Sequence, residues 1–451
     1  QVPTNAMLGG LAYQDSVDVE VISKVKARIS NTARDIFVYD TSKDSDGGAW
    51  RKRTQNTSWY NEGVSSTRGA RKEFPAVAII VVEAYQVTIY DADDPNCPMW
   101  MVFNQSTTQL GAMVGYTGVT IGCCTMLNGI LMVGLDHTAQ GNVAGLRLIN
   151  FISEHHHWKA NISGRHSSQH WPIVDRNGGR NNVNIDSNFI VNEVIDDVDA
   201  IVLPNAPIDV STGLPIPTIA IATNGGVSVI KDNGTVVDIT SNTIIHHEPR
   251  SVAFLGNRLL WTEGNNYDLQ DRAYLNAPIP GSDTSLSHLG SVPSGFIVYG
   301  VGGNQGNIYN DASLTLKLIL RNEFNTGGNG RERKFQISGG DNHIILGCKH
   351  ATEGGLEQIH QNETSPSEGL VNSITTTYNT GWINKDCKLV VCADTDTTDI
   401  SGTNLMSGAT YNSSARVDSY SYSNGSSTLV INDQQSTSDG YVNLTLGGLT
   451  A

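Results

Sequence analysis

The sequence predicts a mainly β protein, a β-propeller of about six to seven blades over residues 31–400, preceded by a short N-terminal helical segment. The first observation behind this prediction is composition. The chain of 451 residues contains 46 glycines, and only 16% of its residues are charged. Short apolar runs alternate with intervals rich in Ser, Thr and Asn. Short strands joined by many turns produce this composition, whereas long helices do not.

The second observation is a repeat. "VYDTSKDSDGGAWRKR" (38–53) and "QVTIYDADDPNCPMWMVF" (86–103) share a Tyr-Asp pair, an acidic turn and a Trp. The Tyr-Asp pairs lie 51 residues apart and the tryptophans 50. A period near 50 residues is typical of four-stranded propeller blades, although two copies leave a pair of β-sandwiches as the alternative. The proposed turn and blade positions are Asp40, Asp44, Asp46, Gly47, Gly48, Trp50, Tyr90, Asp91 and Trp100.

The third observation is a succession of hairpins. Apolar runs flank turn-forming sequences at Asn128-Gly129, Asn224-Gly225, Asp232 to Gly234 and Gly256-Asn257. Asn-Gly between two apolar runs is a strong indication of a tight hairpin turn. Dividing the hairpin region by a blade period of about 50 residues gives about seven blades, or six if the loops are long.

The N-terminal segment "DVEVISKVKARIS" (18–30) has helical spacing. Ile22, Val25 and Ile29 fall on one helical face, and Asp18 is a candidate N-cap. A strand that enters a helix is the alternative, because valines alternate just before this face. Residues 1–72 contain eleven Lys and Arg against eight Asp and Glu, whereas residues 351–451 contain three against eleven.

The acidic turn at residues 40–48 does not match an EF-hand. Aligning Gly47 with the obligatory glycine places Arg53 where the bidentate carboxylate belongs. A looser cation site at Asp40, Asp44 and Asp46 is the remaining alternative. The simpler interpretation is a turn, in which Asp and Gly supply the backbone conformation and Trp50 fills space between blades.

No residue pattern predicts catalysis or a cofactor. Carboxylates at 196, 197 and 199 and at 394, 396 and 399 could form the pair that glycoside cleavage requires, but acids beside strand ends are more often turn-formers. The histidines at 155, 156, 157, 166 and 170 could bind a transition metal, but without zinc-type spacing a polar loop is favoured. The six cysteines, at positions 97, 123, 124, 348, 387 and 392, are expected to be buried thiols.

Overall charge excludes some partner classes. The formal net charge of −15 argues against a general nucleic-acid-binding protein. No run of about 18 apolar residues is present, so no membrane-spanning helix is expected.

Several long blocks resemble large structural proteins of marine tailed bacteriophages, including cyanophages. The similarity extends in blocks from about residue 8 to 402. Resembling segments include "NTARDIFVYDTSKDSDGGAWRKRTQNTSWYNE", "TIYDADDPNCPMWMVFN" and "YNTGWINKDCKLVVCADTDTTDISG". The resemblance implies a propeller followed by carbohydrate-binding-like β-sandwich modules, with residues 401–451 as the start of one. It implies no catalytic residue in this chain.

The resemblance leads us to expect a virion structural protein on the exterior of the phage tail, a tail-fibre or tail-appendage subunit that takes part in host-surface recognition. Its expected partners are other copies of itself, other virion tail proteins and a host surface glycan. A virion-borne glycan depolymerase and a purely architectural tail nozzle or collar propeller are the alternatives.

Residues 1–30 are expected to be an attachment or oligomerisation segment. Their apolar side chains, among them Val25 and Ile29, would be buried against another copy or an acidic neighbouring protein.

Overall fold

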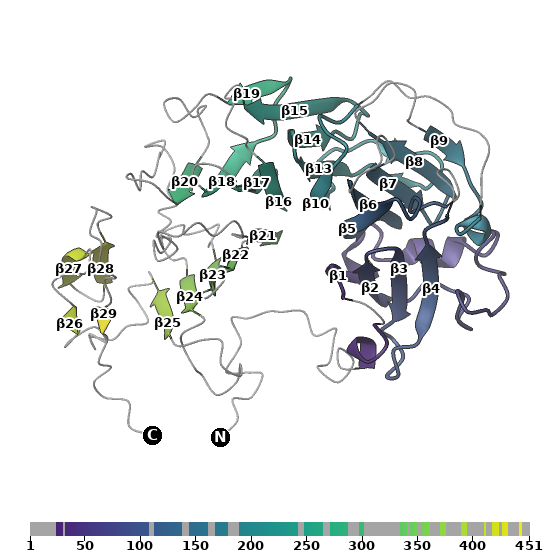
Figure 1. Ribbon diagram of the computed structural model, residues 1–451, viewed down its shortest axis with the longest axis horizontal. Coiled ribbons are helices and arrows are strands. Elements are labelled where there is room, and N and C mark those ends of the chain that lie inside the picture. Colours follow the sequence, from purple (N-terminus) through teal and green to yellow (C-terminus); the bar gives the residue numbers. More distant parts are fainter. Residues whose placement is uncertain are drawn as a thin grey trace. The chain divides into compact units, whose positions relative to one another are not determined.

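The protein is mainly β with few helices, and most of its described strands form sheets of four or five strands (Figure 1). The chain forms two compact units, residues 1–238 and 239–451. The computed structural model describes residues 24–29, 32–107, 112–137, 144–160, 167–178, 189–241, 248–264, 271–286 and 297–301, and then the strands at 334–340, 343–349, 354–360, 370–375, 389–394, 410–411, 417–423, 426–431 and 442–443.

The first sheet is a four-stranded antiparallel meander. Its strands follow the chain in the order β1 (Asp35–Asp40), β2 (Val77–Glu83), β3 (Gln86–Asp91) and β4 (Met99–Asn104). Residues 41–53, between β1 and β2, form two short 3-10 helices, η1 (Thr41–Lys43) and η2 (Ala49–Arg53). The central strand β2 is almost wholly buried, as its VAIIVVE sequence predicts for a strand covered on both faces.

The second sheet has five antiparallel strands in chain order. They are β5 (Val119–Leu127), β6 (Ile130–His137), β7 (Gly145–Asn150), β8 (His155–Lys159) and β9 (Ser167–His170), followed by the 3-10 helix η3 (Ile173–Asp175). The β5–β6 turn is Asn128-Gly129, and both residues have positive φ, at 51° and 73°. The Asn-Gly prediction of a tight turn is therefore confirmed here.

The third sheet has the order β10 (Ile195–Ile201), β13 (Thr218–Thr223), β14 (Gly226–Ile230), β15 (Val236–Ser241) and β19 (Thr284–Leu286), the last pair parallel. A small hairpin of β11 (Ile208–Asp209) and β12 (Leu214–Pro215) lies between β10 and β13 in the chain.

Further strands follow the same plan. One sheet contains β16 (Glu248–Leu255), β17 (Arg258–Gly264), β18 (Asp271–Pro278) and β20 (Ile297–Val301). Another contains β21 (Lys334–Gly340), β22 (His343–Lys349), β23 (Gly354–His360), β24 (Leu370–Thr375) and β25 (Leu389–Asp394). Two-stranded pairs join β26 (Thr410–Tyr411) to β29 (Val442–Asn443) and β27 (Val417–Ser423) to β28 (Ser426–Ile431).

Successive sheets pack through one recurring contact. The first strand of a sheet lies against the first two strands of the sheet before it: β5 against β1 and β2, β10 against β5 and β6, and β21 against β16 and β17. Gly134 of β6 allows the closest approach, because a Cβ there would lie 2.6 Å from Cγ2 of Ile195 in β10. Repeated face-to-face packing of four-stranded meanders is the architecture of propeller blades.

The 50-residue repeat has a different structural meaning from the one predicted. Tyr39 lies on β1 and Tyr90 on β3, so the two copies belong to one sheet and are not successive blades. The two tyrosines even lie in different clusters, Tyr39 in the core shared with the second sheet and Tyr90 on the opposite face. The two tryptophans also differ in position, because Trp50 lies on η2 and Trp100 on β4. Among the described residues, five sheets of four or five strands are present, so the predicted six to seven blades stay a prediction.

The main core lies between the first two sheets and is rich in aromatic residues. Phe74 is its centre: its ring centroid is 5.3 Å from that of Trp50, 4.8 Å from that of Trp100 and 5.1 Å from that of Phe151. All four side chains are at most 1% exposed. Tilted and edge-to-face pairs of this kind add to the free energy of burial.

We expect Gly129→Ala to destabilise the protein more than Gly234→Ala. Both glycines have positive φ at hairpin turns, 73° and 82°, so both alanines strain the backbone. A Cβ at Gly129 would also lie 3.1 Å from Ile152 and 3.3 Å from Trp50, whereas one at Gly234 meets nothing within 4 Å. Urea unfolding followed by tryptophan fluorescence should give a loss of about 1 kcal/mol for the control and roughly 2 kcal/mol or more for Gly129→Ala. Equal losses would show that Trp50 does not restrict this turn.

Candidate functional site

The acidic stretch at residues 38–53 is a turn built around one buried carboxylate. Asp44 is 5% exposed. It accepts hydrogen bonds from the hydroxyl of Tyr39, from Nε1 of Trp50 at 2.7 Å and from the backbone N–H of Asn128 at 2.7 Å. We call these four residues the Asp44 network. Three donors around one acid favour its carboxylate form and bring β1, η2 and the β5–β6 turn together.

Further hydrogen bonds extend the Asp44 network to the separate β11–β12 hairpin. The Tyr39 hydroxyl accepts the Gly129 N–H at 3.0 Å, and Oδ1 of Asn128 accepts the Ser45 N–H at 2.9 Å. Nδ2 of Asn128 donates to the carbonyl of Pro215 at 2.9 Å. Burial raises the pKa of Asp44, and it also raises the pKa of Tyr39 well above its usual range, an effect to which the Asp44 charge contributes. Tyr39 therefore remains a hydrogen-bond donor.

The other predicted residues of this stretch serve the turn. Asp40 caps η1 through the Ser42 N–H, and Asp46 accepts the Gly48 N–H and pairs with Arg53 at 3.0 Å. Gly47 and Gly48 have φ of 62° and 79°. Asp44 points into the core and is saturated by protein donors, so it does not join Asp40 and Asp46 in a cation site. Among the residues that the structure describes, no cluster of His, Cys, Asp or Glu has the arrangement of a metal site.

Two further carboxylates, the buried Glu154 and the partly buried Glu62, tie the first sheet's loops to the second sheet, and no sequence pattern indicates either. Glu154, which has a φ of 53°, accepts the N–H groups of Ser58 and Ile173 at 2.9 Å each. The carboxylate of Glu62 accepts hydrogen bonds from Nη1 and Nη2 of Arg176, at 2.7 and 3.0 Å. These carboxylates lie 19 to 114 positions from the residues that bind them, so they leave no sequence pattern, because only folding makes such residues neighbours.

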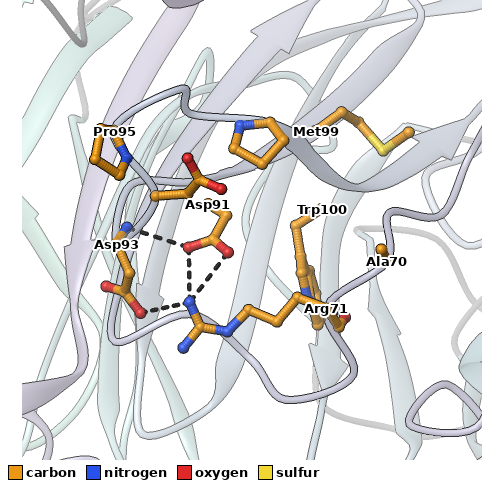
Figure 2. Close-up of a pocket in the computed structure, with 9 residues that line it drawn as sticks. Ala70, Arg71, Asp91, Asp93, Pro95, Met99 and Trp100 are labelled. Carbon is orange, nitrogen blue, oxygen red and sulfur yellow. Dashed lines mark hydrogen bonds and ion pairs between the residues drawn. The ribbon is translucent and has the colours of Figure 1, made fainter.

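The remaining predicted residues, Tyr90, Asp91 and Trp100, belong to one place on the first sheet. Asp91 and Trp100 line an open cleft of about 680 Å³, and Tyr90 precedes it on β3 (Figure 2). We call it the Arg71 cleft; its lining residues are Ala70, Arg71, Asp91, Asp93, Asp94, Pro95, Pro98, Met99 and Trp100.

Arg71 organises the charges of this cleft. Its Nη1 lies 2.8 and 3.0 Å from the two oxygens of Asp91 and 2.7 Å from Asp93, as the dashed lines of Figure 2 show. Asp93 also accepts the N–H groups of Ala76 and Val77 at 2.7 and 2.8 Å. Burial alone would raise the pKa of Asp93, but these backbone bonds and Arg71 lower it below its ordinary value. With Asp94, the cleft holds three carboxylates against one guanidinium and is therefore acidic.

Trp100 forms the closed end of the cleft and is not a stacking platform. It is 1% exposed, and its Nε1 donates to the carbonyls of Arg71 and Glu73 at 3.0 and 3.1 Å. The guanidinium of Arg68 lies 4.5 Å from its ring centroid. These contacts fix the backbone that carries Arg71.

The histidine-rich stretch is a pair of strands, and the favoured prediction of a polar loop was wrong for it. His155 to His157 lie on β8 and His170 on β9, directly opposite His155. Alternation places His156 inside, where its Nε2 lies 3.2 Å from the carbonyl of Met113, while the rings of His155 and His157 lie 4.8 Å apart. Backbone pairing with β7 decided the outcome. His166 lies outside the described residues.

The other predicted groups have structural positions. Asp197 and Asp199 lie on β10, and each accepts the N–H of the next residue at 2.9 and 2.8 Å. Asp394 ends β25, and residues 396 and 399 lie outside the described part. Cys97, Cys123 and Cys124 are buried free thiols, as predicted. No helix in the described ranges is long and apolar enough to cross a membrane.

Comparisons with known proteins add little. No protein-family model matches the chain, and no curated protein matches it. Among solved structures, the chain is similar to one described as KlHsv2 with loop 6CD replaced by a Gly-Ser linker, with 9% identity and a TM-score of 0.26. The match covers 64% of this chain and 64% of that one. A TM-score this low carries no argument about fold or function.

We expect Asp44→Asn to lower the free energy of unfolding by roughly 2–3 kcal/mol. The new amide N–H would face donor groups whose hydrogen bonds the carboxylate now accepts. Asp46→Asn is the matched control. It lies two positions away in a partly exposed ion pair and should cost less than about 1 kcal/mol. Urea unfolding of both variants measures the difference, and similar losses would contradict the role of the Asp44 network.

The Asp93→Asn variant should reveal a pH-dependent contribution to stability. The pKa of Asp93 is lowered from 3.8, so its contribution is present above that value and is lost as pH falls through the folded-state pKa. The stability difference between wild type and variant should therefore be constant above about pH 5 and shrink below the ordinary pKa. Urea midpoints across this pH series test it, and a difference that widens toward acid would contradict the assigned contacts.

Proposed function

We propose that the protein is a virion structural protein, a subunit of a phage tail fibre or tail appendage that engages the host surface through its propeller. The sequence resemblance suggests this setting. The observation that carries the binding role is the Arg71 cleft, an open recess on a sheet whose loops are tied down by buried carboxylates. A binding site on rigid elements loses less conformational entropy when a ligand binds.

The lining of the cleft suits a glycan. In the described part of the chain, Nη1 of Arg71 makes the contacts with Asp91 and Asp93, and Nη2 is left available as a donor. The Asp94 carboxylate supplies an acceptor, while Pro98 and Met99 supply apolar surface. Sugars present hydroxyl groups beside C–H faces, and clefts that combine a few polar groups with apolar walls recognise such ligands. The acidic lining favours neutral or amino sugars over acidic ones.

The glycan depolymerase is the second candidate, and the described carboxylates favour it less. Glycoside cleavage needs one carboxyl group that remains protonated to act as the acid. Asp93 has a lowered pKa and is an ionised carboxylate held by Arg71. Asp197 and Asp199 bind their own strand's N–H groups.

The remaining parts of the proposal follow from the resemblance. A propeller of six to seven blades would span residues 31–400, and residues 401–451 would begin a carbohydrate-binding-like β-sandwich. Residues 1–30 would serve attachment or oligomerisation through side chains other than Val25 and Ile29, which pack on their own sheet. The subunit would act as a homo-oligomer in contact with other tail proteins. The architectural nozzle or collar is the outcome expected if a particle map places the chain away from host-facing surfaces.

A glycan array tests the binding role. We expect neutral or amino-sugar oligosaccharides to bind the purified chain, and Asp94→Asn to weaken binding about tenfold, the effect of one lost charged hydrogen bond. Asp232→Asn, at the β14–β15 turn, is the matched control and should bind as wild type does. Incubation with host polysaccharide should release no reducing ends. Their release would favour the depolymerase, and binding unaffected by Asp94→Asn would place the ligand elsewhere.

A further inference from the structure

Residues 24–29 pack against the face of the first sheet opposite the aromatic core. Residues 24–26 form a helical turn, and Val25 is 3% exposed. Val25 belongs to a buried cluster with Ile79 and Val81 of β2, Tyr90 of β3 and Cys97, and Ile29 packs at its border. For Val25 the expectation of burial against another protein is wrong, because its own chain covers it, and Ile29 is partly buried against the same cluster. Leu8, Leu11 and Ile22 lie outside the described residues.

Two basic side chains on either side of Val25 bind a single turn. Nζ of Lys24 donates to the carbonyl of Pro95 at 2.7 Å, and Nη1 of Arg28 donates to the carbonyl of Cys97. Lys24 and Arg28 are four positions apart, so one helical turn brings both beside the same loop. The segment therefore contacts the first sheet through two apolar side chains, Val25 and Ile29, and two cationic ones.

The turn that they bind, residues 94–97, forms one wall of the Arg71 cleft. Asp94 and Pro95 line the cleft directly, and Pro98 and Met99 continue it (Figure 2). The Cys97 N–H donates to the Asp94 carbonyl at 2.7 Å, and Cys97 has a φ of 45°. A left-handed conformation at a residue other than Gly is strained and persists when its surroundings hold it. Lys24, Val25 and Arg28 supply part of those surroundings.

We propose that this face of the first sheet is a docking groove for a helical segment with one apolar residue between two basic ones, occupied here by residues 24–29, and that the docked segment positions the 94–97 turn. The proposal is independent of the glycan-binding role. While the segment is docked, Val25 and Ile29 pack against the first sheet of their own chain, so they cannot form a contact between subunits.

Cys97 reports directly on docking. Its side chain is 0% exposed beneath the segment, and burial raises the pKa of its thiol to about 11. Undocking would expose the thiol to water and to reagents. Cys123 and Cys124 are buried in the second sheet and provide internal references in the same molecule.

The test is maleimide labelling of the full chain, resolved by mass spectrometry of individual cysteine peptides. Val25→Asp should speed labelling of Cys97 about tenfold while Cys123 and Cys124 stay protected, as expected for local opening. The double variant Lys24→Met/Arg28→Met should speed labelling of Cys97 several-fold, because it removes the two hydrogen bonds to the 94–97 turn. Lys26→Met is the matched control, since Lys26 is exposed on the same turn, and it should label as wild type does.

A peptide of residues 18–30 should then restore protection of Cys97 in the Val25→Asp chain, and the same peptide with Val25→Asp should not. Restoration by the native peptide alone establishes a groove that accepts the segment in trans. Unchanged labelling of Cys97 in Val25→Asp would overturn the proposal. Labelling of all three cysteines would also overturn it, because global unfolding would then explain the exposure, and so would failure of the native peptide to protect.

Discussion

One buried carboxylate, Asp44, holds together the parts of the first unit that the chain itself keeps far apart. Its three donors come from β1, from the 3-10 helix after it and from a hairpin of the next sheet. Such an acid stabilises only the arrangement in which all three donors are present, since a buried carboxylate without them would be costly. The network therefore selects one relative position of the first two sheets, and apolar packing alone would tolerate several.

The aromatic core and the buried hydrogen bonds stabilise the first two sheets in different ways. Phe74 and the tryptophans around it supply buried area, while Glu62 and Glu154 fix the loops that close the core at its edges. Loops normally carry function because they vary freely, but here several are bound to a second sheet. These loops form a rigid surface. On it, the hydrogen bonds and ion pairs with Asp91 and Asp93 fix the orientation of the Arg71 guanidinium.

Charged side chains have two different roles around the turn that joins β3 to β4. On the cleft side, Arg71 neutralises part of an acidic cluster and leaves a polar recess. On the outer side, Lys24 and Arg28 bind backbone carbonyls of the turn that walls this recess. Part of the excess of Lys and Arg in the first 72 residues therefore forms contacts within the chain. By itself, this excess would indicate an acidic partner outside the chain.

The features that depend on neighbouring residues alone could be predicted from the sequence. Asn128-Gly129 required a tight turn because few other residues adopt two consecutive positive φ angles, and the acidic stretch before Trp50 was a turn for the same reason. The helical spacing of Val25 and Ile29 correctly placed both on the face that packs against the first sheet. Tertiary structure decided the rest. It placed the two Tyr-Asp pairs on β1 and β3 of one sheet, paired a run of histidines with β7 as a strand, and determined which residues cover Val25. It also gathered Glu62, Arg176 and Asp44 with their partners, since hydrogen bonds between residues 84 to 114 positions apart depend on distances that exist only after the sheets have packed.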